Sequence, residues 1–201
     1  YIKTDTIAHP IIRATLKELN IDEPIELYSK GPNMGGGGLG SSSSFTCALV
    51  KALNEEFNLN MKNIEIAHKA SEIEISRLGN KIGRQDQYLS ILGGINSLLF
   101  KRNGLVEQRE VPVSLNKAIK DVVNRSLLIY TGISRNANSV LENYEKSSID
   151  HKILTLRDMA DKAYEDSKNN NFESKNLDLL MKQAWEKKRE MPGVLNEGIN
   201  Q

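Results

Sequence analysis

The most specific feature of this 201-residue chain is the run Gly35-Gly36-Gly37-Gly38-Leu39-Gly40-Ser41-Ser42-Ser43-Ser44. Glycine has no Cβ, so such a run lets the backbone reach positive φ and come close to a ligand. Behind it, apolar residues recur at helical spacing and predict an amphipathic helix over Ser42–Asn54. The first turn of a helix presents unpaired N–H groups and a positive dipole end, which favour an anion. The stretch therefore predicts a loop that binds phosphate.

This loop differs from the commonest nucleotide-binding loop. No Gly-Lys-Ser or Gly-Lys-Thr follows the glycines, so it is not a Walker A loop and offers no lysine to the phosphates. A flexible Gly/Ser linker and a plain serine helix cap are the alternatives. Linkers rarely open an amphipathic helix, and this favours the ligand loop.

The elements around the loop follow from apolar spacing. The sequence predicts a helix over Ile7–Leu19, a short strand over Ile25–Ser29 that leads into the loop, and a helix over Asn63–Leu78 that ends at Gly79. The order is therefore strand, glycine loop, helix.

In the second half of the chain predicted strands precede predicted helices, and the C-terminal third is predicted to be mostly helical. The elements of this half are two strands around the Asn103-Gly104 turn, over Ile95–Phe100 and Leu105–Val113, a strand over 127–130, and helices near 136–144, 153–167 and 177–189. The change from strand-rich to helix-rich sequence places a domain boundary near Asn116.

Composition points to a small-molecule ligand. The 27 basic and 26 acidic side chains give a net charge of +1, which provides no electrostatic footprint for nucleic acid or an anionic membrane. No apolar run approaches the roughly 18 residues that span a bilayer, so a cytoplasmic location is expected. The lone Cys47 is expected to be a small buried core residue.

Two carboxylates stand out as candidate site residues. Glu74 lies on the inward stripe of its predicted helix, whereas Glu72 is turned away, so Glu74 is the better candidate for a metal ligand. Asp86 lies in a stretch that reads as a polar loop bounded by glycines. A buried salt bridge of Glu74 and a turn-forming role of Asp86 are the alternatives.

The glycine loop resembles the phosphate loop of the GHMP kinases, which include galactokinase, homoserine kinase and mevalonate kinase. The family usually has Pro where Met34 stands here. The resemblance implies ATP phosphate binding by Gly36, Gly37, Gly38, Leu39, Gly40, Ser41, Ser42 and Ser43.

A second segment, residues 83–88 followed by Gly93-Gly94, resembles the part of the family that carries its catalytic aspartate. The resemblance gives that role to Asp86, which would accept or orient a hydroxyl proton. In galactokinase-like members a helix glutamate precedes the aspartate by a similar interval. This implies that Glu74 binds Mg²⁺ together with Ser42.

Within the family, the motifs at 73–74, 83–88, 93–96, 130–135 and 185–188 look like those of bacterial D-glycero-D-manno-heptose 7-phosphate kinases. The family usually has Lys where Arg84 stands. For the segment that contains Ser134 and Arg135, an ordinary strand-to-helix turn is an equal alternative. The residues implied in substrate binding are Arg84, Gln85, Asp86, Tyr88, Ser134 and Arg135.

The resemblance implies an α+β protein with the two-domain GHMP kinase fold. Residues 1–116 would form an N-terminal α/β ATP-binding domain with a left-handed βαβ-type phosphate loop. Residues 117–201 would form a helix-rich α+β C-terminal domain. The family's N-terminal strand motif and its late glycine-rich motif do not appear, so the chain is expected to be incomplete at both ends.

The implied function is ATP- and Mg²⁺-dependent phosphorylation of the anomeric hydroxyl of a heptose 7-phosphate. The partners would be ATP and a small sugar phosphate, with no nucleic acid and no membrane. A homodimer is one alternative for the oligomeric state. A GHMP kinase for galactose or fucose, and a non-catalytic sugar or nucleotide sensor, are the alternatives.

Overall fold

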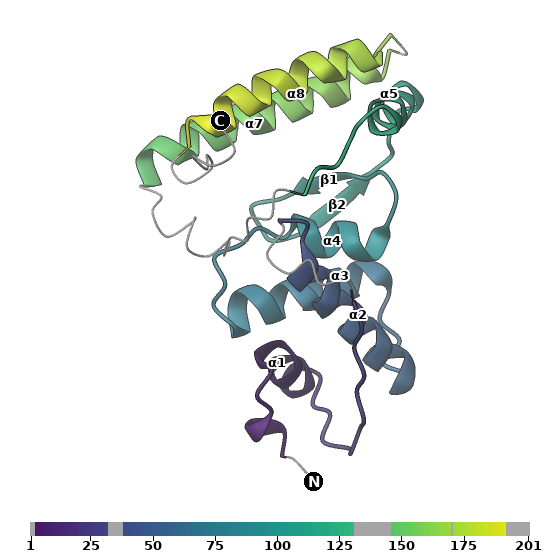
Figure 1. Ribbon diagram of the computed structural model, residues 1–201, viewed down its shortest axis with the longest axis vertical. Coiled ribbons are helices and arrows are strands. Elements are labelled where there is room, and N and C mark those ends of the chain that lie inside the picture. The colour runs from purple at the N-terminus through teal and green to yellow at the C-terminus, as the bar shows by residue number, and fades with distance from the viewer. Residues whose placement is uncertain (1–2, 32–37, 131–145, 170, 192–201) are drawn as a thin grey trace. The chain divides into compact units, whose positions relative to one another are not determined.

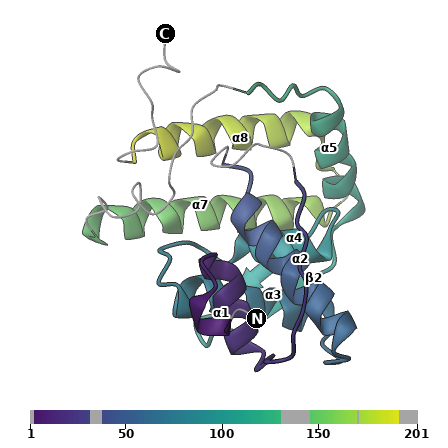
Figure 2. The same ribbon diagram turned by 60° about the horizontal axis from the view of Figure 1, so that its bottom comes forward.

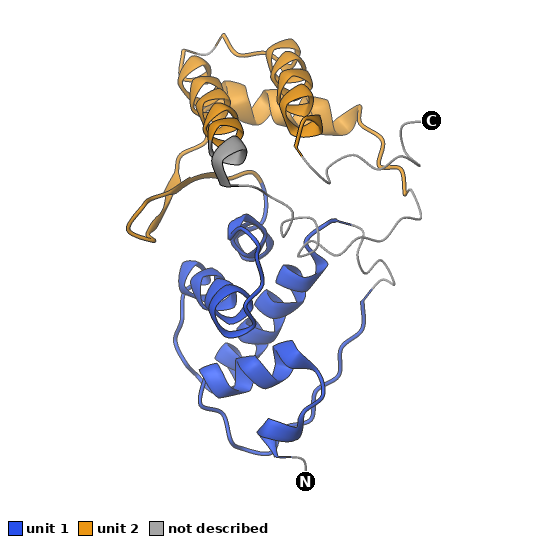
Figure 3. Ribbon diagram, turned by 90° about the vertical axis from the view of Figure 1, so that its left-hand side faces the viewer, with its two compact units in different colours: residues 1–94, 132–139 blue, residues 95–131, 140–201 orange. Residues whose placement is uncertain are grey.

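The computed structural model of the protein describes residues 3–31, 38–130, 146–169 and 171–191 (Figure 1). These residues form two compact units, which Figure 3 colours separately. The first unit covers the described residues up to Gly94, and the second covers those from Ile95 onward. The domain boundary predicted near Asn116 stays a prediction. Within the described ranges, no helix is long and apolar enough to cross a membrane.

The first unit is built from helices. Helices α2, α3 and α4 pack on one another, and α1 packs against α2 and the π-helical turn η2 (Figures 1 and 2). The elements are the 3₁₀ turn η1 (Thr4–Thr6), α1 (Pro10–Glu18), α2 (Ser41–Glu56), α3 (Asn63–Ser71), η2 (Glu72–Arg77) and α4 (Gln85–Leu92).

Helix α2 is held between two apolar clusters. Leu49 and Leu53 pack with Leu16 of α1, and Val50 packs with Ile66 of α3 and with Ile73. Burial of side chains of this size contributes roughly 1.5–3 kcal/mol each. The two clusters therefore fix α2, and with it the point at which the glycine loop ends.

The helix predicted over Asn63–Leu78 is present, but its last part is a π-helix. The N–H of Leu78 donates to the carbonyl of Ile73 at 3.0 Å, five residues back, where an α-helix would use four. The wider turn lies at Glu72–Arg77. π-Turns inside helices are frequent at functional sites.

Two sequence predictions for the first unit are wrong. Residues 25–29 form no strand, because a strand needs a paired neighbour and the described residues of this unit provide none. The segment around Asp86 is the helix α4, not a loop. Apolar spacing did not predict α4, because this helix is only eight residues long and its buried residues are Gln87 and Tyr88.

The second unit joins a β-hairpin to a helical layer. Helix α5 packs on α7 and α8, and α7 packs on α8 (Figure 1). The elements are β1 (Ser97–Phe100), β2 (Val106–Arg109), α5 (Val113–Asn124), α7 (Lys146–Ser167) and α8 (Ser174–Arg189). The strands are antiparallel, with Ser97 opposite Arg109 and Phe100 opposite Val106. This confirms the predicted hairpin at Asn103-Gly104, where Gly104 has a φ of 83°.

Two further predictions need correction. The second strand is shorter than Leu105–Val113, because Pro112 precedes a helix that buries Ser114, Ala118 and Val122 at four-residue spacing. The segment 127–130 is not a strand: it has no ladder partner among the described residues, and its side chains are exposed.

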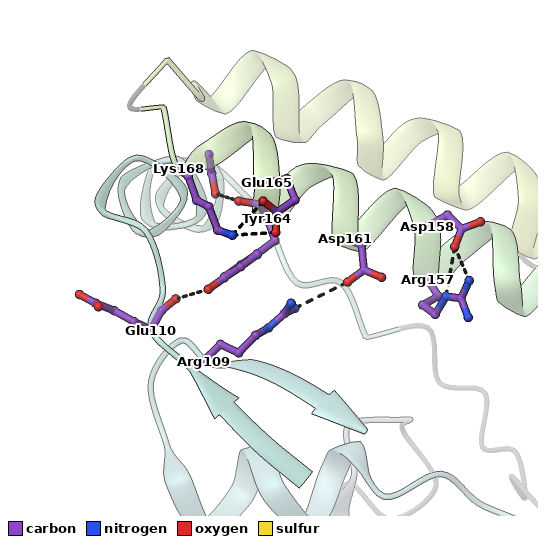
Figure 4. Close-up of polar contacts among 9 residues, drawn as sticks. Arg109, Glu110, Arg157, Asp158, Asp161, Tyr164, Glu165 and Lys168 are labelled. Atoms are coloured by element: carbon purple, nitrogen blue, oxygen red, sulfur yellow. Dashed lines mark hydrogen bonds and ion pairs between the residues drawn. The ribbon is translucent and has the colours of Figure 1, made fainter. Parts of the chain in front are cut away.

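Tyr164 links the hairpin to α7 within the second unit (Figure 4). The guanidinium carbon of Arg109 lies 4.0 Å from the centre of the tyrosine ring, and the Lys168 ammonium lies 4.9 Å from it. The Tyr164 hydroxyl donates to the carbonyl of Glu110 at 3.1 Å, and Arg109 is 3.7 Å from Asp161. These contacts fix the end of β2 against the helix.

Candidate functional site

The described part of the glycine loop runs directly into α2. Gly40 is the N-cap residue, with a left-handed backbone (φ 68°, ψ 28°), and the N–H of Ser44 donates to its carbonyl at 2.9 Å. A glycine cap has no side chain to satisfy the first amides of the helix, so the amides of Ser41–Ser43 can serve an anion. Met34, Gly36 and Gly37 lie outside the described residues.

Asp86 packs directly against this glycine. A Cβ placed on Gly40 would lie 3.1 Å from both Cγ and Oδ2 of Asp86. Asp86 is half-buried in the first turn of α4, which packs on α2. The fold thus brings the predicted catalytic carboxylate to the end of the predicted phosphate loop, 46 residues away along the chain.

We expect Gly40→Ala to displace Asp86. The left-handed φ costs a non-glycine residue about 1–2 kcal/mol, and the added methyl must also push the carboxylate away. A small misplacement of a reacting group is enough to lower kcat, here between about 10- and 10²-fold.

Gly79→Ala is the matched control for Gly40→Ala. Gly79 has nearly the same φ, 69°, but a Cβ there meets nothing within 4 Å. Both variants should lose similar stability in thermal unfolding, and only Gly40→Ala should lose kcat. Equal kcat in the two variants would contradict the role given to the Gly40–Asp86 contact.

Glu74 is a buried carboxylate whose partners are neutral. Its side chain is 0% exposed; the Ser42 hydroxyl donates to Oε1, and the Gln87 amide donates to Oε2 at 2.5 Å. Among the described residues it forms no ion pair. A buried carboxylate is costly unless a cation compensates it. Its negative charge therefore fits a bound cation.

The oxygens of Glu74 and Ser42 are the kind of ligand that Mg²⁺ prefers. The described residues contain no group of three or more His, Cys, Asp or Glu side chains able to hold a metal ion. A cation at Glu74 would therefore need ligands besides such side chains. Nucleotide phosphates and water are the usual ones for Mg²⁺ in kinases.

Cys47 is buried, as predicted. Its Sγ donates to the carbonyl of Gln87 at 3.3 Å. Burial, aided by the negative charge of Glu74, raises the pKa of the Cys47 thiol to about 12. The folded protein should therefore keep this thiol protonated.

We expect Cys47 to resist thiol reagents in the folded protein. With a pKa of about 12, the thiolate fraction at pH 8 is only about 10⁻⁴, and the thiolate is the reactive form. In denaturant the pKa returns to about 8.5 and the thiol should react fully. Absorbance with Ellman's reagent measures both states, and rapid labelling of the folded protein would contradict the burial described here.

The other predicted site residues that the structure describes lie around α4 and α2. Arg84 is half-buried just before α4, and Gln85 is exposed. Tyr88 is 1% exposed, and its burial raises the pKa of its hydroxyl. Ser134 and Arg135 lie outside the described residues. On α2, Ser41 is exposed and Ser43 is buried.

Sequence reasoning missed Gln87 as a part of this site. Its side chain is fully buried against Glu74, one position after Asp86. Once α4 is known to be a helix, helical geometry points to Gln87, because successive residues of a helix are turned by about 100°. Neighbouring residues then face different sides, so Asp86 contacts Gly40 while Gln87 contacts Glu74.

The chain is similar to known sugar kinases. Its residues 6–94 match the model of the GHMP kinases N terminal domain. A D-glycero-alpha-D-manno-heptose 7-phosphate kinase of Campylobacter jejuni is 35% identical over 130 residues, which are 65% of this chain and 38% of the relative. A galactokinase of Clostridium perfringens is 26% identical over 141 residues, 70% of this chain and 35% of the relative.

These alignments cover only part of each relative. A galactokinase of Pyrococcus furiosus is 27% identical over 121 residues, 60% of this chain and 32% of the relative. The chain thus spans about a third of the length of these curated relatives. Residues 6–94, which hold the glycine loop, Glu74 and Asp86, are therefore the part of the chain that is similar to the GHMP kinases N terminal domain.

Proposed function

We propose that the protein containing this chain is a sugar kinase that transfers the γ-phosphate of ATP to the anomeric hydroxyl of a heptose 7-phosphate. The observation that carries the proposal is the convergence of the α2 N-terminus, the Ser42–Glu74 contact and Asp86 in one unit. A phosphate-binding helix end, a metal-binding carboxylate and a proton acceptor are the parts that phosphoryl transfer needs.

ATP would lie with its phosphates at the start of α2. The residues proposed to bind them are Gly36, Gly37, Gly38, Leu39, Gly40, Ser41, Ser42 and Ser43. Mg²⁺ would be held by the Ser42 hydroxyl and the Glu74 carboxylate, and it would neutralise charge on the phosphate oxygens. Similar donor sets of carboxylate, hydroxyl and phosphate oxygens are usual for this ion in kinases.

Asp86 would act on the sugar. Its carboxylate would accept or orient the proton of the anomeric hydroxyl as that oxygen attacks the γ-phosphorus. The bond from phosphorus to the β–γ bridging oxygen breaks, and ADP leaves with the bonding electron pair. The reaction needs no covalent enzyme intermediate, because positioning and charge stabilisation supply the catalysis.

Heptose 7-phosphate is proposed as the acceptor because the heptose kinase aligns at 35% identity and the two galactokinases at 26% and 27%. Arg84, Gln85 and Tyr88 near Asp86, together with Ser134 and Arg135, are proposed to contact the substrate. Cationic side chains suit a sugar that already carries a phosphate. The galactokinase relatives make galactose the second candidate.

A substrate panel tests this proposal. The full-length protein is mixed with Mg-ATP and heptose 7-phosphate, galactose, fucose or mevalonate, and ADP release is measured. The expected result is a kcat/KM for heptose 7-phosphate at least about 10²-fold above the others. The other substrates lack the phosphate, so the protein groups that bind it would be left without hydrogen-bond partners. Preference for galactose would move the assignment to the second candidate. Binding of a sugar without release of ADP would indicate a sensor.

A further inference from the structure

We propose that Gln87 is a positioning residue that orients the Glu74 carboxylate for Mg²⁺. The inference rests on the proposed function, because it takes Glu74 to be the metal ligand. It concerns a residue behind the site rather than one that touches ATP or sugar.

The contacts of Glu74 divide its two oxygens between two elements. Oε1 accepts from Ser42 at the start of α2, and Oε2 accepts from Gln87 in α4 at 2.5 Å. A carboxylate held at both oxygens cannot rotate freely, so Gln87 sets the direction in which Oε1 faces Ser42. Ligating carboxylates are commonly held in this way by hydrogen bonds from behind, and loss of such a partner typically weakens metal binding 10- to 100-fold.

The amide of Gln87 is oriented by this contact alone. Its Oε1 is buried and has no hydrogen-bond partner among the described residues, while Nε2 faces the carboxylate. An unsatisfied buried acceptor costs stability. A flipped amide would place oxygen against oxygen, so the charge of Glu74 decides which end of the amide faces it.

Helix α4 connects this contact to the chemistry. Asp86 contacts Gly40, its neighbour Gln87 contacts Glu74, and the Cys47 thiol donates to the Gln87 carbonyl. One turn of α4 therefore positions both the proposed proton acceptor and the proposed metal ligand. Both depend on how α4 is seated on α2.

The test measures metal binding directly. Free Mn²⁺ is titrated by electron paramagnetic resonance into the full-length protein saturated with ADP, for the wild type and for Gln87→Met, which keeps the size but removes the donor. We expect Mn²⁺ affinity to fall about 10- to 100-fold. The KM for Mg²⁺ should rise with it, while the KM for the sugar stays within about twofold.

Two further variants keep the result interpretable. Gln87→Asn keeps the amide but is one methylene too short to reach Oε2, so it should also weaken Mn²⁺ binding. Thr15→Val is the control for general disturbance of this unit, because the buried Thr15 hydroxyl also lacks a partner among the described residues. It should leave Mn²⁺ affinity unchanged. Thermal unfolding shows which variants are folded.

A double-mutant cycle isolates the contact. In a Glu74→Gln background the charge is gone, so Gln87→Met should have no further effect on Mn²⁺ affinity. Wild-type Mn²⁺ affinity in folded Gln87→Met or Gln87→Asn would overturn the inference while leaving the proposed function intact. Wild-type affinity in Glu74→Gln would instead overturn the metal site itself.

Discussion

Asp86→Asn is expected to lower kcat about 10²- to 10⁴-fold, because an amide cannot accept the hydroxyl proton during transfer. The substitution keeps the size of the side chain, so its packing against Gly40 should be retained. Affinity for ATP should change little, since the phosphates are proposed to bind the loop and the α2 amides. Single-turnover kinetics and nucleotide titration measure the two quantities separately.

The control for this variant is Asp22→Asn. Asp22 is an exposed aspartate of the same unit, outside the proposed site, so its replacement should leave kcat unchanged. If Asp86→Asn turned over at nearly the wild-type rate, Asp86 would lose its proposed role. A parallel loss of ATP affinity and thermal stability would assign it to structure instead.

Glu74→Gln is expected to lower kcat/KM for Mg-ATP about 10²- to 10³-fold and to raise the Mg²⁺ concentration needed for half-maximal rate. The reason is loss of the charge that is proposed to bind the metal, whose transition-state contribution would be several kcal/mol. In metal-free buffer the same variant should melt no lower than the wild type. It removes a buried charge that has no cationic partner among the described residues.

Glu72→Gln, two residues earlier on the same turn, is the matched control. Glu72 is partly exposed and forms an ion pair with Lys69 at 2.8 Å, so its replacement should leave the Mg²⁺ requirement unchanged. A large loss of stability in metal-free Glu74→Gln, without a change in Mg²⁺ requirement, would make Glu74 a structural residue.

The sequence predicts the parts of this site that depend on local chemistry. Glycine at positive φ followed by an amphipathic helix is a local pattern, and the structure confirms α2 behind Gly40. The inward position of Glu74 follows from helical periodicity and is confirmed by its complete burial. The Ser42–Glu74 contact joins two elements, and a family resemblance was needed to predict it.

The missed features depend on tertiary contacts. Residues 25–29 and 127–130 have strand-like composition, but pairing requires a neighbour that lies elsewhere in a fold. Helix α4 buries polar residues, so its pattern resembled a loop, and Gln87 went unnoticed with it. The π-turn that carries Glu74 leaves no clear mark in composition, because it is a change in hydrogen-bond register.

The most direct test is phosphorus NMR of the full-length protein with Mg-ATP and heptose 7-phosphate, run in parallel on wild type, Asp86→Asn and Glu74→Gln. The wild type should convert the γ-phosphate signal of ATP into a new sugar 1-phosphate signal while ADP accumulates. Both variants should form that product at least about 10²-fold more slowly. An unchanged ATP signal with every sugar tested, or wild-type rates in both variants, would contradict a phosphoryl-transfer site built on Gly40, Ser42, Glu74 and Asp86.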